Sequence, residues 1–281
     1  GLFAPLSSFD LDLVKTRKLY SAPSPKVYSA LSLSFSLLSI SYLIKKCASV
    51  FDGSLWHGCI GQMKILLRIE KNGRNDSDYI FMATRKGITK KTNLSHFARK
   101  WKSGIKAINL DEDDRLIGTA ITDGTNEILL ASSSGKLIRF QESKVRAMGR
   151  AARGVKGMKL KKDQKLISLN VADPSKTVLC VSENGYGKKT QLDDFPTHNR
   201  GGQGVISIKT SERNGVMVAA ALVDEADGIM LISDKGTMIR TNVAQVPTLS
   251  RNTQGVKIIT PKEGEKLIEC VNIPQEENPE D

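Results

Sequence analysis

Residues 177–190 read TVLCVSENGYGKKT, in which an apolar run is followed by a turn and by a second run that returns beside the first. The Asn184-Gly185 pair predicts a tight β-hairpin with a type I′ turn, whose two central residues both need positive φ. The same arrangement recurs at intervals of about 50 residues between residues 78 and 273, and repeats of that length are typical of propellers and solenoids. The glycines that close the equivalent hairpin turns are Gly87, Gly135, Gly185 and Gly236.

A second glycine follows the hairpin in every copy and begins a third apolar run, and a fourth run ends the copy. Glycine at the entry of a strand permits close approach to a neighbouring blade or to a phosphate. Four strands in each of four copies predict an all-β, propeller-like domain, whose blades form either an open or a closed ring. The second glycines are Gly104, Gly154, Gly204 and Gly255, and the expected blades cover residues 78–122, 127–172, 177–223 and 228–273.

The regions on either side do not share the repeat. Residues 1–77 are expected to be irregular or partly helical, and residues 274–281 form an acidic tail. The uncharged stretch 27–44 approaches the length of a membrane span, but its leucines and serines alternate with a period nearer to two than to 3.6. We therefore expect no membrane association. Because Gly1 is not an initiator residue, we expect the chain to be a piece of something longer.

The composition favours a polyanionic partner. The 281 residues carry a formal net charge of +12, and nucleic acid is the usual partner of so basic a chain. The four cysteines have spacings that fit neither a zinc site nor a disulfide framework, which is compatible with a reducing cytosol.

The sequence contains no recognisable catalytic or cofactor-binding motif. The three histidines lie far apart in the sequence, and no GxxxxGK[ST] phosphate loop is present, so no cofactor is expected in this segment. The carboxylate run 111–114 predicts a surface turn, with a magnesium site as the alternative.

Two positions of the repeat are basic in every copy. One lies four residues after the first glycine and the other four residues before the second. Lysine and arginine in a periodic arrangement would neutralise phosphates with little dependence on base sequence. We therefore expect a DNA track on the outside of the ring, and the alternative is a strand rim whose lysines protect the edges. The expected DNA contacts are Lys90, Lys91, Lys100, Arg139, Arg150, Arg153, Lys188, Lys189, Arg200, Arg240 and Arg251.

Several stretches resemble the C-terminal domain of the DNA gyrase A subunit. They are FQESKVRAMG (140–149), ENGYGKKT (183–190), GVISIKTSERNG (204–215) and SRNTQGVKII (250–259). The resemblance covers residues 78–273 and implies a β-pinwheel, in which six four-stranded blades exchange a strand between neighbours. It also implies an outer basic face that binds and wraps DNA, supporting ATP-dependent negative supercoiling by the holoenzyme.

The chain departs from that family in three ways. It has four repeats, which resemble the last four of the six, and residues 1–77 contain neither the Arg-rich gyrase box nor the domain of the catalytic tyrosine. The implied partners are duplex DNA, the gyrase B subunit, with which it would form a heterotetramer, and the rest of gyrase A, in a bacterial cytoplasm beside the nucleoid. The holoenzyme would use ATP and Mg²⁺. Alternatives are the equivalent domain of topoisomerase IV, a protein-binding propeller with no role on DNA, and a fragment that does not fold.

Overall fold

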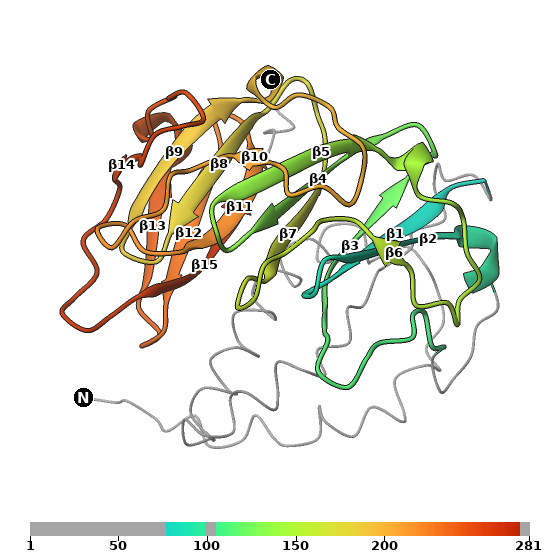
Figure 1. Cartoon of the computed structure of the whole chain (residues 1–281). Coiled ribbons are helices and arrows are strands. Elements are labelled where there is room, and N and C mark those ends of the chain that lie inside the picture. Colours follow the sequence, from blue (N-terminus) through green and yellow to red (C-terminus); the bar gives the residue numbers. More distant parts are fainter. Residues whose placement is uncertain (1–76, 99–104, 276–281) are drawn as a thin grey trace, which may run out of the picture. The chain divides into compact units, whose positions relative to one another are not determined.

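The computed structural model describes residues 77–98 and 105–275, and these residues form antiparallel sheets joined by loops and 3-10 turns (Figure 1). Blade 1 contains β1 (Tyr79–Thr84), β2 (Ile88–Asn93) and β3 (Leu116–Thr122). Blade 2 contains β4 (Glu127–Ser132), β5 (Lys136–Gln141) and β7 (Leu166–Val171). Blade 3 contains β8 (Thr177–Ser182), β9 (Tyr186–Gln191) and β11 (Met217–Val223). Blade 4 contains β12 (Gly228–Ser233), β13 (Met238–Asn242) and β15 (Leu267–Ile273).

A short 3-10 turn follows the second strand of every blade, and three two-residue strands complete the set. The 3-10 turns are η3 (Leu94–Phe97), η4 (Glu142–Lys144), η5 (Leu192–Asp194) and η6 (Val243–Gln245). The short strands are β6 (Val155–Lys156), β10 (Val205–Ile206) and β14 (Val256–Lys257). The predicted all-β fold of four blades is therefore confirmed, and no helix of the described residues is long and apolar enough to cross a membrane. The uncharged stretch 27–44 lies outside the described residues.

The hairpin turns differ in type from the prediction. Gly185 has φ of 80°, but Asp163 is the sole non-glycine residue with positive φ in the described part of the chain, so Asn184 does not adopt the left-handed conformation. The N–H of Gly185 donates to the oxygen of Ser182 at 3.0 Å. This geometry matches the three-residue hairpin loop in which glycine supplies the one left-handed residue, and the type I′ prediction is wrong.

The short strands are exchanged between blades. β6 pairs with β2, β10 with β5 and β14 with β9, so the third strand of each later repeat completes the sheet of the preceding blade. The prediction that each repeat supplies all four strands of its own sheet is therefore wrong. Three sheets have four strands, whereas the fourth, in the order β13-β12-β15, has three among the described residues.

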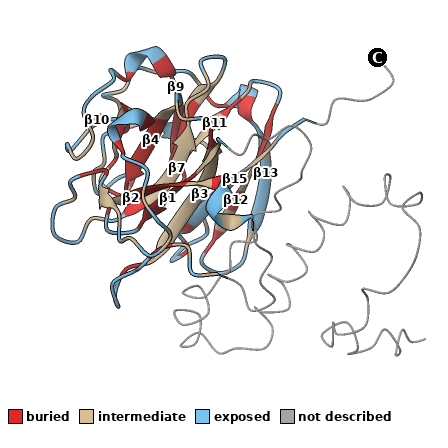
Figure 2. Ribbon diagram, turned by 90° about the vertical axis from the view of Figure 1, so that its right-hand side faces the viewer, coloured by how far each residue is buried: buried red, intermediate tan, exposed pale blue. Residues whose placement is uncertain are grey.

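The core lies between blades rather than within one sheet. Val178 and Cys180 of β8 pack in a cluster with residues of blade 2. Leu179 and Val181 of the same strand pack in a cluster with residues of blade 4. Because both faces of a blade are covered, its central strand is apolar throughout, and the buried residues follow the strands while the loops are exposed (Figure 2). Each fully buried side chain of this size contributes about 1.5–3 kcal/mol.

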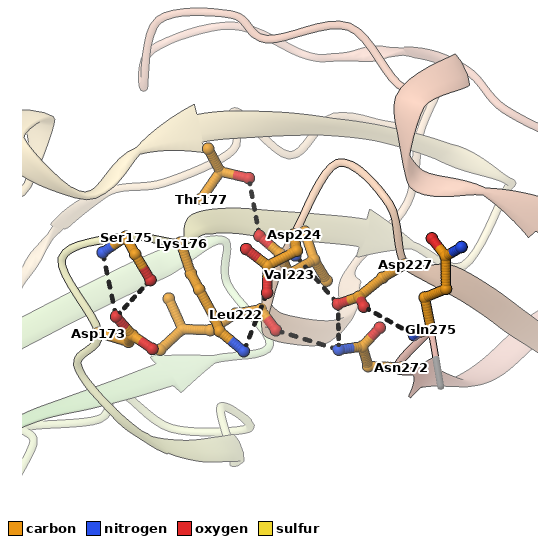
Figure 3. Close-up of polar contacts among 10 residues, drawn as sticks. All are labelled: Asp173, Ser175, Lys176, Thr177, Leu222, Val223, Asp224, Asp227, Asn272 and Gln275. Atoms are coloured by element: carbon orange, nitrogen blue, oxygen red, sulfur yellow. Dashed lines mark hydrogen bonds and ion pairs between the residues drawn. The ribbon is translucent and has the colours of Figure 1, made fainter. Parts of the chain in front are cut away.

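Side-chain amides join the inner strands of neighbouring blades. The amide of Asn272 in β15 donates to the oxygen of Leu222 in β11, at 3.4 Å, and to Asp227 at 2.9 Å (Figure 3). Burial by itself would raise the pKa of Asp227, but the hydrogen bonds from Asp224 N–H, Asn272 and Gln275 N–H outweigh it and hold that pKa below its usual value. The carboxylate therefore fixes the turn between blades 3 and 4.

Candidate nucleic-acid interface

An outer loop leads from the 3-10 turn after the second strand to the second glycine of the repeat. We call residues 145–154, 195–204 and 246–255 the outer loops. Each loop delivers its exchanged strand to the edge of the preceding blade, and the glycine at the junction fits closely there. A Cβ on Gly204 would lie 2.3 Å from the oxygen of Leu137, so no larger residue fits without displacing the strand. Lys100 and Gly104 of the first repeat lie outside the described residues.

The basic residues four positions after the hairpin glycines join neighbouring blades. Lys91 of β2 lies 3.7 Å from Glu142 of blade 2, and both side chains are buried. Lys189 of β9 lies 2.5 Å from Glu225, in the turn between blades 3 and 4. Because 6% of Lys91 and 2% of Lys189 are exposed, the prediction that these two lysines contact DNA is wrong.

Arg139 and Arg240 occupy the same position in blades 2 and 4. The Nε of Arg139 donates to Glu127 at 2.6 Å, and its Nη1 donates to the oxygen of Leu192 in blade 3 at 3.1 Å. With 15% of its side chain exposed, Arg139 has little surface left for DNA. Arg240 is exposed and forms no ion pair with any residue that the structure describes. Each engaged member of this set contacts the following blade, and Arg240 belongs to the last described blade.

Two lysines that directly precede this position are fully buried and hold outer loops. The ammonium of Lys188 donates to the backbone oxygens of Ser250 and Arg251, at 2.5 and 2.6 Å. The ammonium of Lys90 donates in the same way to the oxygen of Arg150. Because neither side chain is accessible, the prediction of DNA contact is wrong for both. Their role is to position the loops that carry the next set of arginines.

Burial of these two lysines makes the stability of the domain depend on pH. Burial lowers the pKa of Lys90 and of Lys188 from 10.5 to about 8. Between those values the unfolded chain binds the proton and the folded chain does not, so stability rises with pH through this window. We expect the free energy of unfolding to increase by about 1–2 kcal/mol for each lysine between about pH 7.5 and about pH 9.5.

Urea unfolding at the two pH values measures this increase, and the Lys90→Met, Lys188→Met double variant is the comparison. The variant should lose the increase while keeping the remaining pH dependence of the chain. An equal increase in both proteins would contradict the assignment.

Arginines four positions before the second glycine brace the exchanged strands. Arg200 donates from Nε to the oxygen of Lys144 at 2.8 Å and from Nη1 to the oxygen of Lys156 in β6 at 3.1 Å. Arg251 donates from Nη1 to the oxygen of Ile206 in β10 at 3.3 Å. Arg150, Arg200 and Arg251 are all half-buried, so each keeps part of its guanidinium at the surface. This set therefore combines a structural contact with a surface charge.

Exposed lysines on and beside the exchanged strands complete the basic surface. They form no ion pair with any acidic residue that the structure describes. Backbone hydrogen bonds join their segments to the outer loop of the next repeat, from Lys159 N to Gly202 O and from Lys209 N to Thr253 O, both at 2.8 Å. The basic surface thus continues from blade to blade along the outer edge of the sheets. We call Lys156, Lys159, Lys209 and Lys257 the outer lysines.

Arg153 and the acidic run near it have a different character. Arg153 is exposed but forms an ion pair with Asp111, and Asp113 pairs in the same way with Lys86. Asp114 accepts from the backbone N–H of Lys86 at 3.0 Å. The run is therefore a surface turn, as predicted, and the described residues contain no cluster of acidic, histidine and cysteine side chains that could hold a metal ion.

These features define a strand-exchanging, propeller-like repeat domain with a basic outer edge. The family model described as "DNA gyrase C-terminal domain, beta-propeller" matches residues 78–123, 126–173, 176–224 and 229–273. The chain belongs to this family, and its fold is the β-pinwheel.

Relatives that are named as the A protein of DNA gyrase match the same part of the chain. The protein from Pseudomonas aeruginosa is 50% identical over 190 residues, which cover 68% of this chain and 21% of the relative. The protein from Salmonella typhimurium is 46% identical over 189 residues, which cover 67% of this chain and 22% of the relative. The chain therefore spans about a fifth of the length of these relatives.

Two solved structures share the fold. The C-terminal domain of DNA topoisomerase IV gives a TM-score of 0.66 at 27% identity, over 70% of this chain and 62% of that one. The DNA gyrase A C-terminal domain gives a TM-score of 0.64 at 26% identity, over 71% of this chain and 67% of that one. The fold alone therefore does not separate the two enzymes.

Proposed function

We propose that the chain binds duplex DNA without sequence preference along its outer edge and wraps it, as the C-terminal part of gyrase A. The observation that carries the proposal is the series of outer lysines, which are exposed on three successive repeats and free of described acidic partners. Lysines without acidic partners release counterions from phosphates, which supplies affinity without base contacts.

The arrangement of the exchanged strands supports wrapping as well as binding. Because each exchanged strand is the outermost strand of its sheet, the charges follow the blades around the outside of the domain. DNA bound along such a surface must bend, so any preference would come from its deformability. We place the site on Arg150, Arg200, Arg251 and the outer lysines, with Arg153 and Arg240 as further exposed contacts.

In the complete enzyme, the wrapped segment would be delivered to the DNA gate. Its partners would be the gyrase B subunit, together with the remainder of gyrase A, in the bacterial cytoplasm. ATP and Mg²⁺ would serve those other parts, because this segment contains neither a nucleotide-binding motif nor the catalytic tyrosine domain.

A topological measurement tests wrapping directly. A nicked plasmid is ligated in the presence of increasing amounts of the full chain, the protein is removed, and the linking number is read from the distribution of topoisomers. We expect a shift of one sign that grows with the amount of protein bound. Binding in a gel-retardation assay without any shift would show that the four blades bind DNA but do not wrap it.

The equivalent domain of topoisomerase IV is the second candidate, because its solved structure superposes as well as that of the gyrase domain. The sequence relatives favour gyrase. Adding the chain to a gyrase that lacks this domain, and to a topoisomerase IV with the same deletion, would separate the two. The matching enzyme is the one whose activity on DNA the chain restores.

A further inference from the structure

Three of the four blades have an outer edge that is covered by the exchanged strand of the next repeat. The oxygen of Gly135 accepts the N–H groups of Ser207 and Ile208, at 2.8 and 3.1 Å. The oxygens of Gly87 and Gly185 accept the equivalent pair of N–H groups in their blades. Beneath the covering strand in blade 2, Leu137 and Ile138 are at most 1% exposed.

The edge of β13 in blade 4 is uncovered among the described residues. Gly236 has the same φ of about 80° as the other hairpin glycines, but a Cβ on it would meet nothing within 4 Å. Met238 and Ile239 of β13 are 43% and 39% exposed, although they correspond to the buried Leu137 and Ile138. An open edge with apolar side chains is a template for another strand.

The first repeat carries a strand of the right sequence that pairs with no described blade. Residues 104–108 read GIKAI, and the exchanged segments of the later repeats read GVKGM, GVISI and GVKII. Ile108 is buried against Ile80 and Met82 of its own blade, just as Met158 of the next repeat packs between blades 1 and 2. In the described part of the chain, however, the N–H groups of residues 105–108 donate to no backbone oxygen.

We propose that β13 accepts the segment Ile105–Ile108 of a second copy of the chain. The N–H groups of Ala107 and Ile108 would donate to the oxygen of Gly236, as those of Ser207 and Ile208 donate to Gly135. The added strand would cover Met238 and Ile239. Main-chain pairing at an open edge is an established form of recognition, in which the side chains set the specificity.

The contact is head-to-tail, because the donor segment lies in the first blade and the acceptor edge in the fourth. The blades pack in series through β3, β7, β11 and β15, so the two ends of the series are different surfaces. A contact between unlike surfaces leaves one donor and one acceptor free after each addition. The chain therefore associates into oligomers whose length grows with concentration.

Sedimentation equilibrium of the full chain tests the proposal with two variants. Ile239→Lys places a charge on the acceptor edge, and Ala107→Pro removes a donor N–H. The wild-type chain should show a mass that rises with concentration above the monomer value of 30.7 kDa, and each variant alone should remain monomeric. An equimolar mixture of the two should form a species of twice the monomer mass and nothing larger, because each partner keeps one working surface.

Controls separate the edge from general stickiness and from misfolding. Val271→Lys changes another exposed apolar residue of blade 4, which is 41% exposed, and should leave the association intact. Circular dichroism should be the same for all variants; if Ala107→Pro is unfolded, Ile105→Asp replaces it as the donor variant. A monomeric wild-type chain, association that survives Ile239→Lys, or a mixture that stays monomeric would each overturn the proposal.

Discussion

Replacement of the four outer lysines by glutamine is expected to lower the affinity of the chain for duplex DNA by about 10²–10³-fold at about 0.1 M salt. Each phosphate contact contributes about 0.9 to the slope of log K against log salt, so the slope should also flatten by about 3–4. The lysines are exposed and make no side-chain hydrogen bond or ion pair with described residues, so their loss should leave the fold intact. Fluorescence anisotropy of a labelled duplex, repeated over a series of salt concentrations, measures both quantities.

A variant with the same change in net charge is the control. It replaces four exposed lysines of the turns before the inner strands and of the fourth hairpin, away from the exchanged strands, and should change affinity by a factor of a few. These residues are Lys165, Lys235, Lys262 and Lys266. An equal loss in both variants would mean that net charge, rather than the outer edge, attracts DNA.

The arginines of the outer loops are less suitable for this test. Arg200 and Arg251 donate to backbone oxygens of β6 and β10, so their substitution would loosen the exchanged strands as well as remove charge. A loss of binding could then arise from either cause. The outer lysines brace no strand in this way; the one side-chain contact among them is that of Lys257, whose ammonium lies 6.0 Å from the ring centre of Tyr186. They therefore report on DNA contact more directly than the arginines do.

The hairpins, the strands and the number of blades could be predicted from the sequence because they depend on local patterns. Apolar runs bounded by glycine turns recur in every repeat, and strands such as β8 begin and end at the predicted residues. The partner of each exchanged strand is not a local property. Val205 pairs with Leu137, many residues away in another repeat, and the sequence of the segment is the same whichever blade receives it.

The basic residues were the least predictable feature, since a column of lysine and arginine serves either DNA or the junction between blades. Lys188 and Lys189 stand together in β9, and both are buried, one on backbone oxygens and the other on Glu225. The carboxylate and the carbonyls that hold them come from the following repeat. Only the packing of blade on blade separates these residues from Lys257, which has the same chemistry and is exposed.

The glycines of the hairpins offer a direct measure of how much the exchanged strands stabilise the fold. Gly185 and Gly236 both have φ of 80°, so alanine incurs a similar backbone strain of about 1–2 kcal/mol at either position. At Gly185 the Cβ would also lie 2.2 Å from the oxygen of Ile259, whereas at Gly236 it would meet open space.

We therefore expect Gly185→Ala to cost at least about 3 kcal/mol more than Gly236→Ala in the free energy of unfolding. The added Cβ must push β14 away from β9, which breaks the hydrogen bonds from Ile258 and Ile259 to the oxygen of Gly185, at 2.9 and 3.2 Å. Urea unfolding followed by circular dichroism gives the comparison. Equal losses at the two positions would mean that the exchanged strand contributes little, and that contacts between the blade faces hold the blades together without it.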